Sequence, residues 1–145
     1  MATIPLPRLS SHFDLQDPRF SSLVYQTRIK TPITPTTGVT YTAAQIQSGF
    51  ILRSGPTGAV TDTLPSAAAI CAAIQGPFVN LSFEFRVRNI STGSLNFAVG
   101  AGGTAPVQGT FSCATVSDKM LLIILTNVTI GQETYQVESW GGGTY

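Results

Sequence analysis

Residues 61–90 read TDTLPSAAAICAAIQGPFVNLSFEFRVRNI, and this stretch decides the fold. It joins a turn-forming start, a segment without any charge at residues 66–75, and a segment of alternating apolar and polar residues at 79–88. The uncharged segment predicts a helix, and the alternation predicts a strand with one buried face. A short apolar helix next to a half-buried strand is the unit from which the remainder of the chain is interpreted.

The segment at about residues 65–75 predicts one short helix. Pro65 suits a first helical turn, Asp62 or Thr63 would supply the capping oxygen, and Gly76 marks the end. A helix that is apolar on all sides must be covered on all sides. A small β domain covers one face, so we expect the other face to meet another copy of this chain or a neighbouring protein. The residues expected at that contact are Ala68 and Ala72, together with Ala67 and Ala73.

The alternation at residues 79–88 assigns opposite roles to neighbouring side chains. Phe83 and Phe85 are expected in the core, whereas Arg86 and Arg88 are expected on a polar face that borders solvent or a partner surface. On that face Glu84 is expected next to one of the two arginines. Residues 89–93 form a turn that leads into an apolar alternation at 95–99, which predicts a hairpin.

The remainder of residues 41–140 predicts further strands. A helical turn capped by Thr42 precedes a short strand at 50–53, and further strands are expected at about 110–114, 119–128 and 133–139. We therefore predict an all-β fold, in which residues 41–140 form a compact antiparallel β-sandwich of jelly-roll-like form with one short helix. Residues 141–145 are expected to form a flexible tail.

Residues 1–40 differ in composition and predict an extended N-terminal arm. They contain five prolines and four of the eight basic residues, with isolated apolar side chains between them. The arm either lies across neighbouring subunits or folds back over its own domain. In the first case the contact residues are Leu6, Leu9, Phe13, Phe20 and Tyr25.

The charge content favours an assembled protein. Charged residues make up 10% of the chain, against roughly 25% in a typical soluble domain. None occurs between Lys30 and Arg53 or between Arg88 and Asp118. A monomer usually keeps itself soluble with mixed surface charge, so these stretches suit a surface buried between subunits. The alternative is a β domain covered by Ser and Thr that is weakly charged.

Several functions lack support in the sequence. The net charge of +1 gives no general attraction to nucleic acid or to an anionic membrane, and the N-terminus lacks the features of a signal peptide. His12, the single histidine, lies in the arm, and no acid pair or metal-ligand spacing stands out. We therefore expect no enzyme activity, no cofactor and no bound metal, with Cys71 and Cys113 as small, reduced core residues.

Several motifs between Tyr41 and Ser139 carry a resemblance. They are Thr42-Ala43-Ala44-Gln45-Ile46, Ser48-Gly49-Phe50-Ile51, residues 61–70, Ser82 to Asn89, and the glycine-rich run Val99 to Thr104. Together they resemble virion surface proteins of tailed phages and large DNA viruses, among them capsid decoration, cement and fibre proteins. The resemblance covers about two thirds of the chain and leaves out the arm. It implies a compact β domain built into a virion, often as a trimer.

Two functional hypotheses follow. In the first, the chain is a non-enzymatic minor capsid protein, of the decoration or cement kind, that forms a homotrimer and anchors to the major capsid protein partly through its arm. It would then be assembled in the host cytoplasm and located on the capsid surface. In the second, the domain is a fibre or receptor- or carbohydrate-binding head. An exposed aromatic platform would be needed for this, and Trp140, Tyr135 and Tyr145 are the available cluster.

Overall fold

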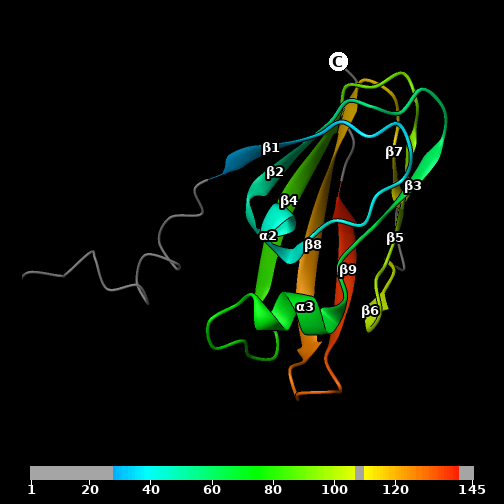
Figure 1. Ribbon diagram of the computed structural model, residues 1–145. Helices are drawn as coiled ribbons and strands as arrows, with labels where there is room; N and C mark the ends of the chain where they lie inside the picture. The colour runs from blue at the N-terminus through cyan, green and yellow to red at the C-terminus, as the bar shows by residue number, and fades with distance from the viewer. Residues whose placement is uncertain (1–27, 107–109, 141–145) are drawn as a thin grey trace, which may run out of the picture.

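The computed structural model describes residues 28–106 and 110–140, and strands dominate this part of the chain (Figure 1). In chain order the elements are β1 (Ile29–Ile33), α2 (Ala43–Gln47), β2 (Gly49–Arg53), β3 (Val60–Thr63), α3 (Ala67–Ala72), β4 (Ser82–Asn89), β5 (Leu95–Ala98), β6 (Gly103–Thr104), β7 (Ser112–Cys113), β8 (Ser117–Asn127) and β9 (Thr134–Trp140). The prediction of a β-rich domain is confirmed.

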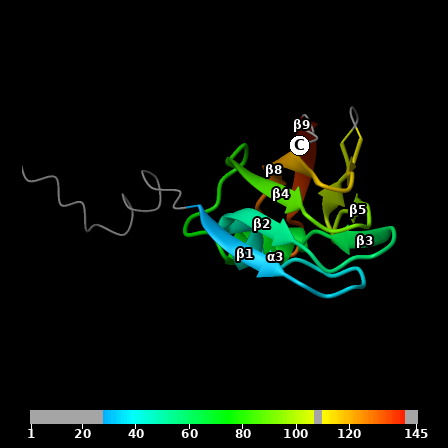
Figure 2. The same cartoon turned by 90° about the horizontal axis from the view of Figure 1, so that it is seen from above.

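The strands form two sheets around one core. The first sheet has six strands in the order β1-β2-β4-β8-β9-β6, and the second has three in the order β3-β5-β7. Figure 2 shows the three-stranded sheet beside the larger one. Buried side chains of both sheets and both helices, including Ile51, Phe85, Ile46, Ile70 and Leu95, belong to one hydrophobic cluster. That cluster defines the inner face of the six-stranded sheet.

The prediction of antiparallel pairing is wrong for several pairs. β1 and β2 are parallel, as are β2 and β4, β3 and β5, and β6 and β9. Parallel neighbours require a long crossover between them, and the helices supply part of it. The connection from β1 to β2 contains α2, and that from β2 to β4 contains β3 and α3. The sheet also begins at Ile29, earlier than the expected domain boundary at residue 40.

Strand β4 shows why the predicted hairpin is also wrong. Its neighbours in the sheet are β2 and β8, so both of its edges are occupied. Strand β5 pairs instead with β3 and β7 in the second sheet. The turn after β4 therefore carries the chain from one sheet to the other.

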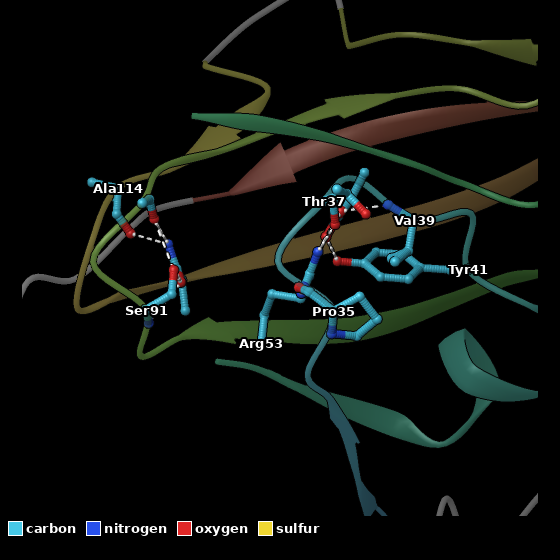
Figure 3. A network of polar contacts seen from close by, with 10 residues as sticks. Pro35, Thr37, Val39, Tyr41, Arg53, Ser91 and Ala114 are labelled. Atoms are coloured by element: carbon cyan, nitrogen blue, oxygen red, sulfur yellow. Dashed lines mark hydrogen bonds and ion pairs between the residues drawn. The ribbon is translucent and has the colours of Figure 1, made fainter. Parts of the chain in front are cut away.

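The turn after β4 is held by a buried asparagine. The Asn89 side-chain amide donates to Gly93 O at 2.8 Å and to Ala114 O at 3.0 Å, and its carbonyl oxygen accepts from Ser91 N at 3.0 Å (left side of Figure 3). Ser91 and Asn89 are both buried. These bonds satisfy polar groups that would otherwise be costly to bury.

The helices differ from prediction in number and in length. The helical turn at Thr42 is confirmed as α2, where the Thr42 hydroxyl accepts from Gln45 N and the Gln45 side chain accepts from Thr42 N. The described part of the chain thus contains two short helices rather than one. Helix α3 spans Ala67–Ala72, shorter than residues 65–75, and Ser66 is its cap rather than Asp62 or Thr63.

Asp62 is instead part of a buried ion pair between the two sheets (right side of Figure 3). Arg53 at the end of β2 donates from Nε to Asp62 Oδ2 on β3 at 2.9 Å, and neither side chain has any exposed area. The Tyr41 hydroxyl donates to Asp62 Oδ2 at 2.6 Å, and Val39 N donates to Asp62 Oδ1 at 3.0 Å. Asp62 therefore has three partners.

The other guanidinium donors of Arg53 hold the loop between β1 and α2. They donate to Pro35 O and to Thr37 O, the latter at 2.5 Å. One pair thus ties β2, β3 and residues 35–41 together. A buried charge is tolerated when it is paired and its remaining polar atoms are hydrogen-bonded, and both conditions hold here.

The glycine-rich run after β5 closes around a second buried hydroxyl. The Tyr135 hydroxyl accepts from Gly100 N at 3.0 Å and donates to Pro65 O at 3.0 Å. A side chain at Gly103 would place its Cβ 2.5 Å from the Tyr135 ring. The glycines therefore allow the backbone to approach this ring closely, which gives the run a structural role.

The two phenylalanines of β4 differ in how deeply they are buried. Phe85 is fully buried, whereas Phe83 is only partly buried. We expect Phe85→Ala to lower the free energy of unfolding by about 3–5 kcal/mol, and Phe83→Ala to lower it by clearly less. Urea denaturation of the two variants checks the order, and equal losses would contradict the difference in burial between these two positions of the inner face.

A second prediction concerns Tyr41, whose pKa is raised far above its usual value by burial and then by the adjacent Asp62 carboxylate. At pH 7 Tyr41→Phe removes a hydrogen bond to a charged group, and we expect a loss of about 1.5–3 kcal/mol. Above a pH of about 10 the unfolded tyrosine ionises while the folded one stays neutral. The unsubstituted protein then loses stability that the Tyr41→Phe variant retains. The difference between their free energies of unfolding should therefore narrow. Urea denaturation at neutral and alkaline pH tests this, and a constant difference would contradict it.

Candidate interaction surfaces

One face of the six-stranded sheet is covered by no described helix or strand, and we call it the uncovered face. It lies opposite the inner face, which the hydrophobic cluster packs against α2, α3 and the second sheet. The pairing register places rows of side chains across it. Three of the rows are Lys30, Phe50, Arg86, Met120 and Trp140; Pro32, Leu52, Arg88 and Asp118; and Glu84, Leu122 and Glu138, and a further row is Ser82, Ile124 and Gln136.

Charge is concentrated on the uncovered face. Among residues 28–106 and 110–140, the charged side chains that are not buried are Arg28, Lys30, Glu84, Arg86, Arg88, Glu133 and Glu138. All of these except Glu133, which precedes β9, lie on this face. The predicted placement of Arg86 and Arg88 opposite Phe85 and Val87 is thus confirmed, while their role in an interface stays a prediction.

Ion pairs hold two of the β4 charges. Arg86 pairs with Asp118 of β8, whose side chain is 12% exposed. Glu84 was expected to face Arg86 or Arg88, but its partner is Arg28, which precedes β1. Both side chains of the second pair are 45% exposed, so solvent screens it and its contribution to stability is small.

A shallow hollow of about 500 Å³ lies on the same face. It is lined by Glu84, Met120, Leu122 and Trp140 from strands β4, β8 and β9. Trp140 is 60% exposed. Three apolar side chains with one carboxylate at the margin favour an apolar occupant. The sequence alone does not indicate this site, because Met120 and Leu122 belong to a continuous apolar run in which outward and inward positions look alike.

Helix α3 presents a second, uncharged surface. Ala67, Ile70 and Cys71 are buried against the core, whereas Ala68 and Ala72 are exposed. Ala67 was expected at a subunit contact, and this is wrong, because it is 1% exposed within its own domain. Ala68 and Ala72 keep their predicted place on the outward side of the helix.

The remaining expected contact residues divide into two groups. Leu6, Leu9, Phe13, Phe20 and Tyr25 lie outside the described residues, as does Tyr145. Tyr135 is fully buried with its hydroxyl bonded internally, so it cannot form an aromatic platform with Trp140. The prediction that Tyr135 belongs to an exposed aromatic cluster of a carbohydrate-binding head is therefore wrong.

The described residues offer little for other chemistry. Within 28–106 and 110–140, no group of three or more His, Cys, Asp or Glu side chains is placed to hold a metal ion. In the same ranges, no helix has the length and apolar character needed to cross a membrane. Cys71 and Cys113 are buried free thiols, as expected, and burial raises the pKa of both.

Comparison with protein families, with curated proteins and with solved structures finds no match to this chain.

The surface of α3 leads to a prediction about self-association. We expect Ala72→Asp to leave the domain folded and to give monomers, because a carboxylate on the exposed side would be buried unpaired in a subunit contact. Ala67→Asp is the matched control, and it should unfold the domain because its site is inside the core. Sedimentation and circular dichroism measure both effects. An unchanged oligomer in the Ala72→Asp variant would rule out a contact at this helix.

Proposed function

We propose that this chain is a non-enzymatic virion structural protein, a minor capsid protein of the decoration or cement kind. In this proposal it forms a homotrimer, binds the major capsid protein partly through its N-terminal arm, and resides on the capsid surface. The two sheets act as the layers of a β-sandwich. Its parallel pairs set it apart from a jelly roll, whose strands are antiparallel.

The distribution of charge is the observation that carries this proposal. Six of the seven non-buried charged side chains of the described part lie on the uncovered face. The helix α3 and the second sheet carry none in that part, and their exposed residues are mainly small or neutral. A monomer distributes charge of both signs over its surface for solubility. A side of the domain whose helix and sheet carry no exposed charge, with Glu133 as the one non-buried charge of the described residues away from the uncovered face, suits contact with other subunits.

The sequence motifs support the same assignment. The glycine-rich run encloses the hydroxyl of Tyr135, and Asp62 of the turn-forming segment joins the two sheets. These two motifs, which help to carry the resemblance to virion surface proteins, therefore serve the fold. This favours a structural protein over an enzyme.

Binding to capsids that lack this protein tests the proposal. We expect the purified chain to bind them saturably. The full-length variant Leu6→Ser/Leu9→Ser/Phe13→Ser should bind at least about tenfold more weakly, because each buried apolar side chain contributes about 1.5–3 kcal/mol. A deletion of residues 1–19 is a second form of the test. A deletion extending to residue 35 would remove β1 and confuse anchoring with folding.

Binding to host cells or to glycans, without binding to capsids, would contradict a cementing role and favour a fibre head. Undiminished capsid binding by the arm variant would leave the capsid role intact but remove the arm from it. Unaltered circular dichroism of the variant is the control for folding.

A further inference from the structure

The chain enters the described structure at the edge of the uncovered face, and the Arg28 side chain reaches from there to the hollow. Arg28, the first described residue, donates from Nη2 to Glu84, which lines the hollow. The Arg28 stem passes over Gly49, where a Cβ would lie 3.1 Å from Arg28 Cγ. The absence of a side chain at Gly49 thus lets Arg28 lie across the uncovered face. The segment of residues 1–27 therefore joins the described structure at the edge of this face.

The distances allow the preceding residues to reach the hollow. Strand β1 is separated from β8 by β2 and β4. Three steps between neighbouring strands span about 14 Å, which an extended chain crosses in about five residues. One more step, to β9 and Trp140, needs about six. Tyr25, Leu23 and Phe20 precede Arg28 by three, five and eight residues. Three residues span about two strand steps and reach β4, which carries Glu84; five reach β8, and eight are enough to reach β9 and Trp140.

The chemistry of this segment matches that of the hollow. Residues 20–27 read FSSLVYQT and carry no charge, and the hollow is formed by Met120, Leu122 and Trp140 with Glu84 at its margin. The Glu84 carboxylate already has Arg28 as its partner. An uncharged segment that carries the apolar side chains of Phe20, Leu23, Val24 and Tyr25 can therefore cover the hollow without leaving that carboxylate unpaired.

Addition of this segment as a further strand beside β1 is disfavoured. Ile29 N and Ile33 O bond toward β2, so Lys30 and Pro32 direct their backbone polar groups to the outer edge. Pro32 has no N–H to donate there, and proline at an outer strand position blocks pairing. The face of the sheet, rather than its edge, is the surface left for residues 20–27.

We propose that residues 20–27 pack against the uncovered face of their own sheet, with Phe20, Leu23 and Tyr25 at the hollow beside Trp140. The N-terminal arm then has two parts. Residues 20–27 complete the domain, and residues 1–19, with Leu6, Leu9 and Phe13, remain for partners. This inference concerns the isolated chain and holds independently of the proposed capsid role.

Trp140 is the single tryptophan of the chain and provides the probe. The experiment compares three full-length proteins: the native chain, Phe20→Ser/Leu23→Ser/Tyr25→Ser, and the matched control Leu6→Ser/Leu9→Ser/Phe13→Ser. Selectively excited tryptophan emission and acrylamide quenching are measured without capsids. We expect the first variant to show a red-shifted emission maximum and a larger quenching constant, and the control to match the native chain.

Each other outcome overturns the inference. Identical emission and quenching in all three proteins would mean that residues 20–27 do not cover Trp140. A change in the control alone would assign the contact to residues 1–19. A signal in the native chain that changes on dilution would mean that the segment comes from another copy. Capsid binding is not measured here, so failure of the proposed function leaves this result unaffected.

Discussion

The buried pair of Arg53 and Asp62 is the interaction on which the arrangement of the two sheets depends. It joins the end of β2 in the larger sheet to β3 in the smaller one, and it also fixes the loop that leads into α2. A pair with no exposed area must have its polar atoms satisfied. Tyr41, Val39 and two carbonyl groups meet that requirement, so the position of one sheet relative to the other is fixed by a small set of hydrogen bonds.

The two faces of the larger sheet follow from this arrangement. The inner face packs against α2, α3 and the smaller sheet, which leaves the uncovered face for charge. Ion pairs from Arg28 to Glu84 and from Arg86 to Asp118 organise that charge around an apolar hollow. The fold thus separates a charged, partly apolar face from a neutral surface that includes Ala68 and Ala72, and the proposed assembly and the proposed packing of residues 20–27 use different surfaces.

Local patterns in the sequence predicted local structure well. The alternation around Phe85, the cap at Thr42 and the central position of β8 depend on neighbouring residues, and the structure has all three. Strand partners could not be predicted in this way, because pairing depends on contacts between distant segments. Asp62 illustrates the difference. Its position before a helix favoured a cap, but Arg53, nine residues earlier, lies opposite it across the two sheets. Nothing in the local pattern around Asp62 indicates that Arg53 lies close to it in space.

A double-mutant cycle on Arg53→Met and Asp62→Asn tests this central link most directly, with the free energy of unfolding measured by urea denaturation. We expect each single change to cost about 3–5 kcal/mol, because it leaves a buried charge without its partner, and the double change to cost well below the sum. Additive losses below about 1 kcal/mol each would contradict it, since the pair would then not hold the two sheets together.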